Sequence, residues 1–489
     1  MPAFKSIYTD YILFPTLVLL TASFPLPIAY NSVFTILLFM VFIIDLRNLK
    51  NNIRLYFSNP RNVLLLVMLL SLILSMAYSD DKKLAMKGMI TAMPLLSLPL
   101  AMTTASKLSL RQIAILKKVF VFSCLITSMI YFIQTGIRIG LFDGSYKFQP
   151  VSTAYQSSYL VYNLTYHHLT PSIHAVFFSL YIAFAVFILL FDLQWKTRLT
   201  RISQGIMVLY FLIYLILLTS ATINFALYSF IIAYLYLKYS FKKLWHYLLF
   251  FALIAFGAAI TDYLLLVKYI GPDIGDIVYR FDTPSINQKI LLSYVAVILV
   301  GAAAIIIKLT IRKNYKLVLG CSLLIAALVG LIYLTKATNN RNSGDAKLNN
   351  ISVRANYSAE ALRIIKKHPV FGVGIGDKKY KLIERNLELG DQRYLEFGAD
   401  SKPEGVFNAH NQFLDFWIAA GIVPVLCLLF FFINEFSKAL RYRHILYLGL
   451  LYCFCLFCFT DMPMMVQRGV VFFLFFICLF ENEIKQKIK

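Results

Sequence analysis

Charged residues are scarce in this sequence. Asp, Glu, Lys and Arg together make up 15% of its 489 residues, whereas hydrophobic residues make up 60% and the mean hydropathy is +0.72. Such a composition excludes an ordinary soluble domain. Apolar runs of roughly 17–25 residues recur along the whole chain, which is the length that crosses a bilayer as a helix. The runs are continuous rather than alternating, which excludes a β-barrel. The sequence therefore predicts an all-α, polytopic helical membrane protein.

Acidic residues are the scarcer of the two charged classes, with 24 Asp and Glu against 47 Lys and Arg, a net charge of +23. In a soluble protein this excess would suggest a nucleic-acid partner. Here the cations lie mostly in short loops between the apolar runs, where they set the orientation of a membrane protein. We therefore expect membrane lipids and no nucleic acid among the partners.

Cysteine is also rare, and each cysteine lies inside an apolar run. The seven are Cys124, Cys321, Cys427, Cys453, Cys455, Cys458 and Cys478. The cluster CFCLFC could suggest a metal site, but its neighbours are Leu and Phe, and no His or carboxylate joins it at ligand spacing. Small apolar filler is the favoured interpretation. We expect no metal site, no cofactor and no disulfide framework.

About fourteen runs qualify as spans, so we predict roughly 12–14 transmembrane helices. The candidates are 10–27, 30–46, 62–78, 85–104, 118–137, 172–191, 203–219, 222–238, 245–266, 289–308, 316–335, 411–434, 445–459 and 464–481. Every second loop is basic, as in RNLKNNIR, KTRLTR and KALRYR, and the short intervening links SDDKK, TSA and FTDMP carry no net positive charge. The positive-inside rule then places both termini in the cytoplasm.

Three exterior segments are longer than a turn requires: 138–171, 267–288 and 336–410. The third is long enough to be functional. We predict a division into a helix bundle over 1–335, a loop over 336–410 that carries the catalytic motifs, and C-terminal transmembrane helices over 411–489. Within the loop, SAEALRIIKKH predicts a helix capped by Ser358 and ended by Pro369, and DKKYKLIERNLEL predicts a second helix.

The glycines Gly372, Gly374 and Gly376 follow the first loop helix in VFGVGIG. Their spacing is wrong for a dinucleotide fingerprint, and no βαβ unit surrounds them. Two interpretations remain. The glycines form a tight turn that lets backbones pack closely, or they form a backbone nest whose amides face an anion.

Two side chains near the loop could carry chemistry. Arg354 is either a solvated surface cation or a bidentate ligand for phosphate oxygens. His410 lies in NAHN, at the mouth of the apolar run 411–434. It is either an interface residue or a general base, the role that histidine fills most often near neutral pH. A polar side chain at the end of a span is energetically unfavourable unless it has a hydrogen-bond partner or takes part in function.

Together these motifs resemble the O-antigen ligase and polymerase family, bacterial membrane glycosyltransferases that use polyprenyl-diphosphate-linked glycans. The resemblance is specific over about 354–425. The matching positions are Arg354, Tyr357, His368, Pro369, Gly372, Gly374, Gly376, His410, Asn411, Leu414 and Gly421. One departure stands out, because Ala221 occupies the position where the family carries a second arginine. Arg280 and Arg468 are the candidates to replace it.

The resemblance implies an inverting, metal-independent glycosyltransferase in the bacterial inner membrane, with its active site facing the periplasm. His410 would take the proton of the acceptor hydroxyl, and Arg354 would hold the departing diphosphate. Substrate-binding roles would fall to Arg280, Arg468, Asn411 and the three glycines. The loop contains no Asp-x-Asp or other acidic pair of the kind that would indicate a divalent metal. The donor would be a polyprenyl-diphosphate-linked glycan, and the acceptor a lipid- or glycan-linked sugar.

Within the family, the match favours an O-antigen ligase that acts on lipid A–core. An O-antigen or exopolysaccharide polymerase is the alternative. A different class, a transporter or flippase for lipid-linked glycans, would also have a dozen spans. We would then expect charges within spans, internal repeats and short loops. This sequence instead concentrates its polar residues in one exterior loop, which favours the enzyme.

The alternation of basic loops yields a prediction on topology. Single cysteines placed at Ser343 and Ser401, in a background that lacks the native cysteines, should react with a membrane-impermeant thiol reagent in intact spheroplasts, because both positions lie in the exterior segment 336–410. Protection of both positions until lysis would overturn the orientation.

Overall fold

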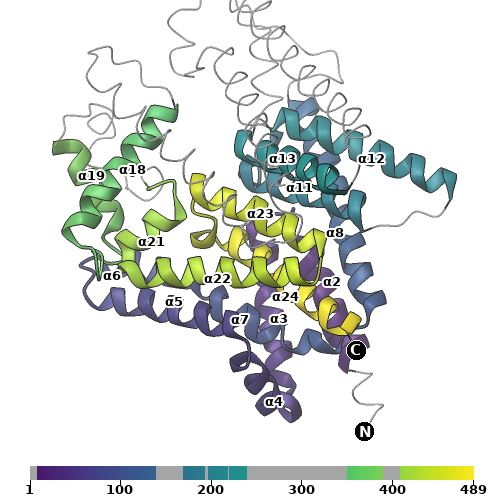
Figure 1. The fold of residues 1–489 in the computed structure, drawn as a ribbon, viewed down its shortest axis with the longest axis horizontal. Coiled ribbons are helices and arrows are strands. Elements are labelled where there is room, and N and C mark those ends of the chain that lie inside the picture. The colour runs from purple at the N-terminus through teal and green to yellow at the C-terminus, as the bar shows by residue number, and fades with distance from the viewer. Residues whose placement is uncertain are drawn as a thin grey trace, which may run out of the picture. The chain divides into compact units, whose positions relative to one another are not determined.

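The computed structural model describes residues 8–138, 169–192, 197–218, 220–238, 350–388 and 408–488. Within these residues the regular structure is helical and contains no strand, which confirms the all-α fold class (Figure 1). Five helical segments among them are long and apolar enough to cross a membrane: Pro60–Ala77, Lys82–Lys107, Leu110–Arg138, Arg198–Leu217 and Ile422–Arg441. The predicted spans 245–266, 289–308 and 316–335 lie outside the described residues, so the total of about 12–14 stays a prediction.

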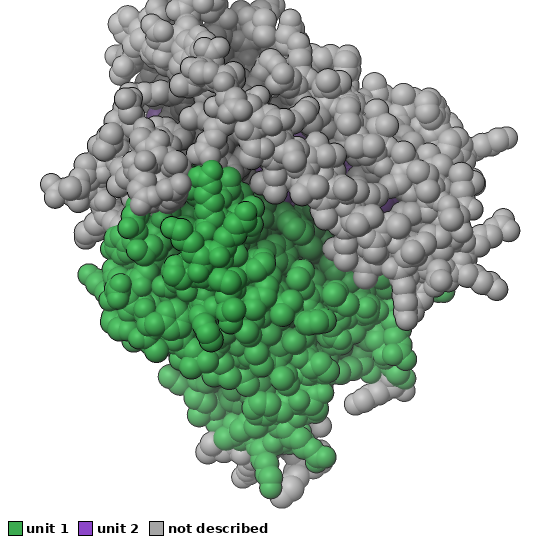
Figure 2. Space-filling model, turned by 60° about the vertical axis from the view of Figure 1, so that its left-hand side comes forward, with its two compact units in different colours: residues 1–125, 187–194, 356–489 green, residues 126–186, 195–355 purple. Residues whose placement is uncertain are grey.

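The chain forms two compact units, coloured in Figure 2. Unit 1 comprises residues 1–125, 187–194 and 356–489, and unit 2 comprises residues 126–186 and 195–355. The domain boundary predicted at residue 335 lies outside the described residues, so the predicted division stays a prediction.

Unit 1 holds the candidate site. Its N-terminal elements are η1 (Tyr8–Leu13), α2 (Phe14–Ser23), α3 (Ile28–Ile44), α4 (Leu46–Phe57), α5 (Pro60–Ala77), α6 (Lys82–Ala92), α7 (Pro94–Ala101), η2 (Thr104–Lys107) and the first half of α8 (Leu110–Arg138). Its C-terminal elements are most of α18 (Asn350–Lys367), α19 (Lys378–Glu388), α21 (Gln412–Ala420), α22 (Ile422–Arg441), α23 (Ile445–Thr460), η4 (Pro463–Met465) and α24 (Gln467–Ile488).

The core of unit 1 lies around α24. Every residue from Val470 to Leu479 is buried, as expected for a helix that is apolar on all sides and surrounded by other helices. Edge-to-face aromatic contacts, such as Phe24 with Phe472 at 5.5 Å between ring centroids, join it to the C-cap of α2. Beside this core, α22 packs along α5 (Figure 1).

Unit 2 contains the second half of α8, most of α11 (Ala175–Phe191), α12 (Arg198–Leu217) and α13 (Ala221–Lys238). Its buried aromatic residues form a chain, because the Phe178 ring contacts both Tyr131 and Tyr214. A capping box between Thr197 and Thr200 begins α12, in which the side chain of each threonine accepts the backbone N–H of the other.

The predicted span 411–434 is wrong as a single helix. Gly421 lies between α21 and α22 with φ +77°, so the apolar run bends there. A Cβ atom at this position would meet the carbonyl oxygen of Val370 at 1.7 Å. The break therefore exists because another segment of backbone crosses the helix at that point, and only glycine leaves room for it.

The N-cap predicted at Ser358 is also wrong. α18 begins at Asn350, so Ser358 lies inside the helix. The end before Pro369 is confirmed, since α18 stops at Lys367, and α19 confirms the second loop helix.

The crossing at Gly421 yields a prediction. Gly421→Ala should lower the free energy of unfolding by at least about 2 kcal/mol, because the new Cβ adds a steric clash to an unfavourable left-handed conformation. Gly205→Ala is the matched control. Gly205 lies in α12 with nothing within 4 Å of a built Cβ, so alanine there should be neutral or stabilising by up to about 1 kcal/mol. Thermal unfolding midpoints in detergent compare the two, and equal midpoints would contradict the expectation.

Candidate functional site

The glycine-rich segment that follows α18 runs along the C-terminal end of α21. The N–H of Val373 donates to Ile418 O at 2.7 Å, and the N–H of Gly374 donates to Ala419 O at 3.1 Å. The Trp417 indole Nε1 donates to Pro369 O at 2.8 Å. These hydrogen bonds hold one end of α21 against the segment.

On its other side the same segment binds the corner between α5 and α6. The N–H groups of Ile375 and Gly376 donate to the hydroxyls of Ser75 and Ser79 at 3.2 and 3.1 Å. The buried carboxylate of Asp377 accepts the backbone N–H groups of Asp80 and Asp81 at 2.7 and 2.9 Å. The segment is thus fixed between two neighbours that are far apart in sequence.

Asp81 continues this network at the start of α6. Its carboxylate accepts the Leu84 N–H at 2.8 Å and the Tyr380 hydroxyl at 3.1 Å. The hydrogen bond from the Leu84 backbone lowers the pKa of Asp81, so the side chain stays an ionised acceptor at neutral pH.

The three glycines are needed for these close approaches. A Cβ would meet Ile418 O at 2.4 Å from Gly372, Ser79 Oγ at 2.4 Å from Gly374, and Asp81 O at 2.3 Å from Gly376. Each backbone N–H from Gly372 to Lys378 donates to an acceptor within the protein. Of the two interpretations, this arrangement favours close backbone packing over an anion nest, because the amides that would bind an anion already have partners.

A buried ion pair ties the segment to α21 a second time. Lys378 Nζ lies 2.5 Å from Asp415 Oδ2, with 8% and 1% of the two side chains exposed. Two buried charges must be paired, because an isolated one is strongly disfavoured. Neither residue was singled out from the sequence. The sequence gives little indication that the two residues form a pair, because they are far apart in the chain and the segment 389–407 lies between them.

His410 lies just before α21, and two different elements contact it. Its ring stacks on Tyr357 of α18, with 5.8 Å between centroids and an interplanar angle of 27°. Its Nδ1 lies 3.9 Å from Asp461 Oδ1, which is longer than a hydrogen bond but close enough for charge attraction once the ring is protonated. About a quarter of the His410 side chain is exposed, 26%, so a substrate can reach it.

The backbone of His410 is left-handed, with φ +44°. This conformation is uncommon for a residue with a side chain and costs on the order of 1–2 kcal/mol. Residues held in such regions cluster at functional sites. The His410 N–H donates to Asn408 Oδ1 at 2.9 Å, which helps to hold the turn.

Asn411 and Gln412 fix the start of α21 to the segment that carries Asp461. The Asn411 side chain accepts the N–H groups of Phe413 and Leu414, so it is the N-cap of the helix. It also donates to Phe459 O at 3.2 Å, and Gln412 Oε1 accepts the Met464 N–H at 2.8 Å. The position of the histidine relative to the carboxylate is thus set by backbone contacts on both sides of Asp461.

The predicted arginines are only partly placed. Arg354 lies in α18, three residues before Tyr357. Arg280 and the side chain of Arg354 lie outside what the structure describes. Arg468 is buried in the first turn of α24, which follows Asp461 closely in the chain.

Asp461 is the main residue that sequence reasoning missed. It lies in FTDMP, which predicts only a short link between spans with no net positive charge. The hydrogen bond from the Met462 N–H to Asp461 Oδ1, at 2.8 Å, orients the carboxylate.

Among the described residues, no group of three His, Cys, Asp or Glu side chains could hold a metal ion.

Comparison with known proteins gives one family match and no match among curated proteins. Residues 291–429 match the family model described as O-antigen ligase. The matched region contains Arg354, the glycine-rich segment and His410, whereas Asp461 and Arg468 lie beyond it. This match supports assigning the chain to the O-antigen ligase and polymerase family.

Proposed function

We propose that this protein is a glycosyltransferase that moves a glycan from a polyprenyl-diphosphate carrier to lipid A–core, as an O-antigen ligase does. The observation that carries the proposal is the placement of His410. The ring is accessible, is stacked on Tyr357, and has a carboxylate on its Nδ1 side. A histidine held in this way suits the removal of a proton from a hydroxyl group.

In the proposed reaction an acceptor hydroxyl oxygen attacks the anomeric carbon of the donor. The bond from that carbon to the diphosphate oxygen breaks, and the diphosphate leaves with the bonding electron pair. The hydroxyl proton passes to His410. Because Nδ1 lies on the Asp461 side, Nε2 is the nitrogen that takes it, and the Asp461 carboxylate stabilises the imidazolium that forms. A single displacement of this kind inverts the anomeric centre.

Positive charge must surround the diphosphate as it leaves. In the proposal Arg354 supplies one guanidinium, which binds phosphate oxygens bidentately and stays charged at any relevant pH. Arg468 or Arg280 supplies the second, in place of the arginine that the family carries where this chain has Ala221. These arginines would perform the role of a divalent metal, so we propose a metal-independent enzyme.

The proposed reaction takes place at the periplasmic face of the bacterial inner membrane, with both termini in the cytoplasm. Support comes from the alternation of basic loops in the sequence. His410 lies at the end of an apolar helix run, which suits a donor whose diphosphate sits at the level of the lipid headgroups while its prenyl chain lies in the bilayer.

The surface polysaccharide of a deletion strain tests the choice of acceptor. We expect the lipopolysaccharide to lose all long chains while lipid-linked polymer accumulates, because a ligase acts on the finished polymer. Core that carries a single repeat would indicate a polymerase instead. Gel analysis of lipopolysaccharide and of extracted carrier lipid, with and without a plasmid-borne wild-type copy, distinguishes the two.

Turnover by purified variants tests the roles at the site. His410→Gln should lower turnover by about 10²–10⁴ while donor binding stays nearly intact, because a general base acts only on the chemical step. Asp461→Asn should lower turnover by about tenfold or more, since it acts through His410 across partly solvated space. The assay contains excess EDTA, in which we expect wild-type activity to persist.

Asp80→Asn is the matched control for these variants. Asp80 is an exposed carboxylate at the α5–α6 corner, and its side chain makes no ion pair among the described residues. We expect wild-type turnover from it. Near-normal turnover in a well-folded His410→Gln enzyme would exclude the general-base role.

A further inference from the structure

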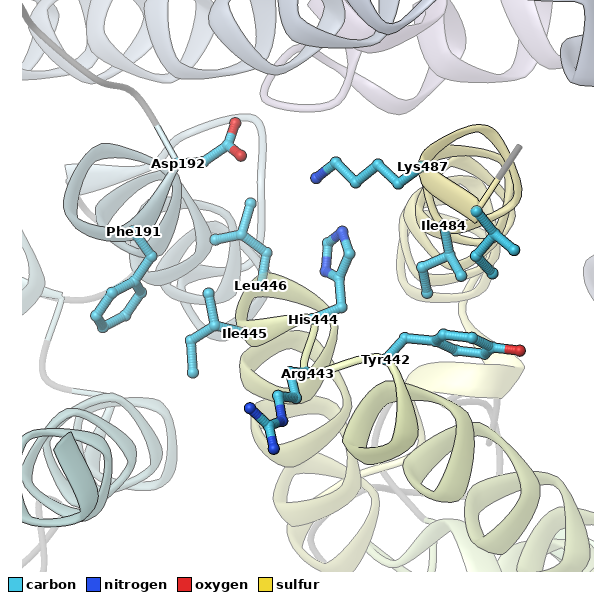
Figure 3. Close-up of a pocket in the computed structure, with 10 residues that line it drawn as sticks. Phe191, Asp192, Tyr442, Arg443, His444, Ile445, Leu446, Ile484 and Lys487 are labelled. Carbon is cyan, nitrogen blue, oxygen red and sulfur yellow. The ribbon is translucent and has the colours of Figure 1, made fainter.

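A cavity of 360 Å³, whose lining is drawn in Figure 3, lies where α22 ends, α23 begins and α24 ends. α22 starts beside the glycine-rich segment and ends at Arg441, and α23 runs from Ile445 to the residue before Asp461. Helices of this length span roughly 25–30 Å. The cavity is therefore separate from the proposed catalytic site.

Three residues that line the cavity, Asp192, His444 and Lys487, belong to a larger cluster of charged and polar groups. Lys117 Nζ lies 2.7 Å from Asp192 and 3.0 Å from Glu483, and Lys487 Nζ lies 2.6 Å from Glu483. His444 Nδ1 accepts the backbone N–H of Tyr447, so its proton sits on Nε2, which faces Glu483 at 3.5 Å. Within this cluster the positive charges of the two lysines cancel the negative charges of the two carboxylates.

Arg443 adds a positive charge to the lining that no carboxylate of this cluster neutralises. Its side chain lines the cavity and is exposed, and within the described residues it forms no ion pair. In Figure 3 it projects away from the side on which Asp192 and Lys487 lie. The lining therefore carries one net positive charge, in the form of a guanidinium.

The backbone at Arg443 is left-handed, with φ +51°, at the end of α22. Glycine is the residue usually found at this position after a helix, because it adopts the conformation without strain. An arginine there gives up some stability, which suggests a role for its side chain beyond ending the helix.

The rest of the lining is apolar. Phe191, Ile445, Leu446 and Ile484 contribute hydrocarbon surface, and Ile488 at the edge is 62% exposed. The outer face of α22 is apolar as well, with exposed residues such as Phe430. The site thus combines a cation with hydrocarbon surface at the end of a membrane-spanning helix, which suits a lipid better than a soluble anion.

We propose that this cavity binds an anionic phospholipid, with the phosphate on the Arg443 guanidinium and an acyl chain against Phe191 and Ile445. Guanidinium and phosphate pair through two parallel charge-assisted hydrogen bonds. Basic pockets between transmembrane helices bind lipid head groups in this way. The net charge of the lining favours an anionic lipid over a zwitterionic one.

Arg443→Gly provides the test, because glycine removes the cation and also relieves the left-handed backbone. In lipid-free detergent this variant should unfold at the wild-type temperature or above it. Phosphatidylglycerol should raise the unfolding midpoint of the wild-type protein but not that of the variant. Native mass spectrometry should show at least about tenfold weaker binding of phosphatidylglycerol to the variant.

Arg441→Gln is the matched control. Arg441 is the last residue of α22, lies over the Tyr442 ring at 5.7 Å, and does not line the cavity. We expect it to bind phosphatidylglycerol as the wild-type protein does. Equal loss in both variants would show general attraction to the basic loop and overturn the site. Equal binding of phosphatidylcholine, or equal stabilisation by inorganic phosphate alone, would overturn the assignment to an anionic lipid.

Discussion

The proposed site depends on one constraint, the passage of the backbone from Gly372 to Lys378 between α21 and the α5–α6 corner. Its N–H groups bond to both neighbours, and side chains at its glycine positions would collide with them. Because α21 is held at its C-terminal end by this segment and at its N-terminal end by Asn411, the helix has little freedom to move. The position of His410, which immediately precedes that N-cap, therefore depends on hydrogen bonds that almost all have a backbone atom as one partner, together with the Lys378–Asp415 ion pair.

Most membrane helices and the C-terminal end of α18 were predictable from the sequence. Apolar runs predict both ends of α5 and α23 and the C-terminal end of α8 to within a few residues, because a bilayer imposes a minimum length on a span. The start of α8 lies further upstream than its apolar run. Pro369 marks the end of α18, because proline disfavours a helical residue before it. These features depend on local composition alone.

Features that depend on segments meeting in space were not predictable. Nothing near Gly421 in the sequence shows that the carbonyl of Val370 crosses there, so the run 411–434 was expected to form one helix. Asp461 follows an unremarkable apolar run, and only the fold brings it to 3.9 Å from His410. Ser358 is a good N-cap by residue type, but α18 continues past it toward Arg354. The sequence signals for capping describe what a residue can do, and tertiary contacts decide whether the helix needs it.

The buried pair of Lys378 and Asp415 has an evolutionary consequence. Removal of one partner would leave the other charge buried and alone, at a cost of roughly 3–5 kcal/mol, whereas replacement of both by apolar residues can be neutral. Substitution at either position is therefore blocked unless the other changes with it. Across homologous sequences the two positions should covary, so that the pair is kept as a unit or lost as a unit, even though neither residue touches the substrate.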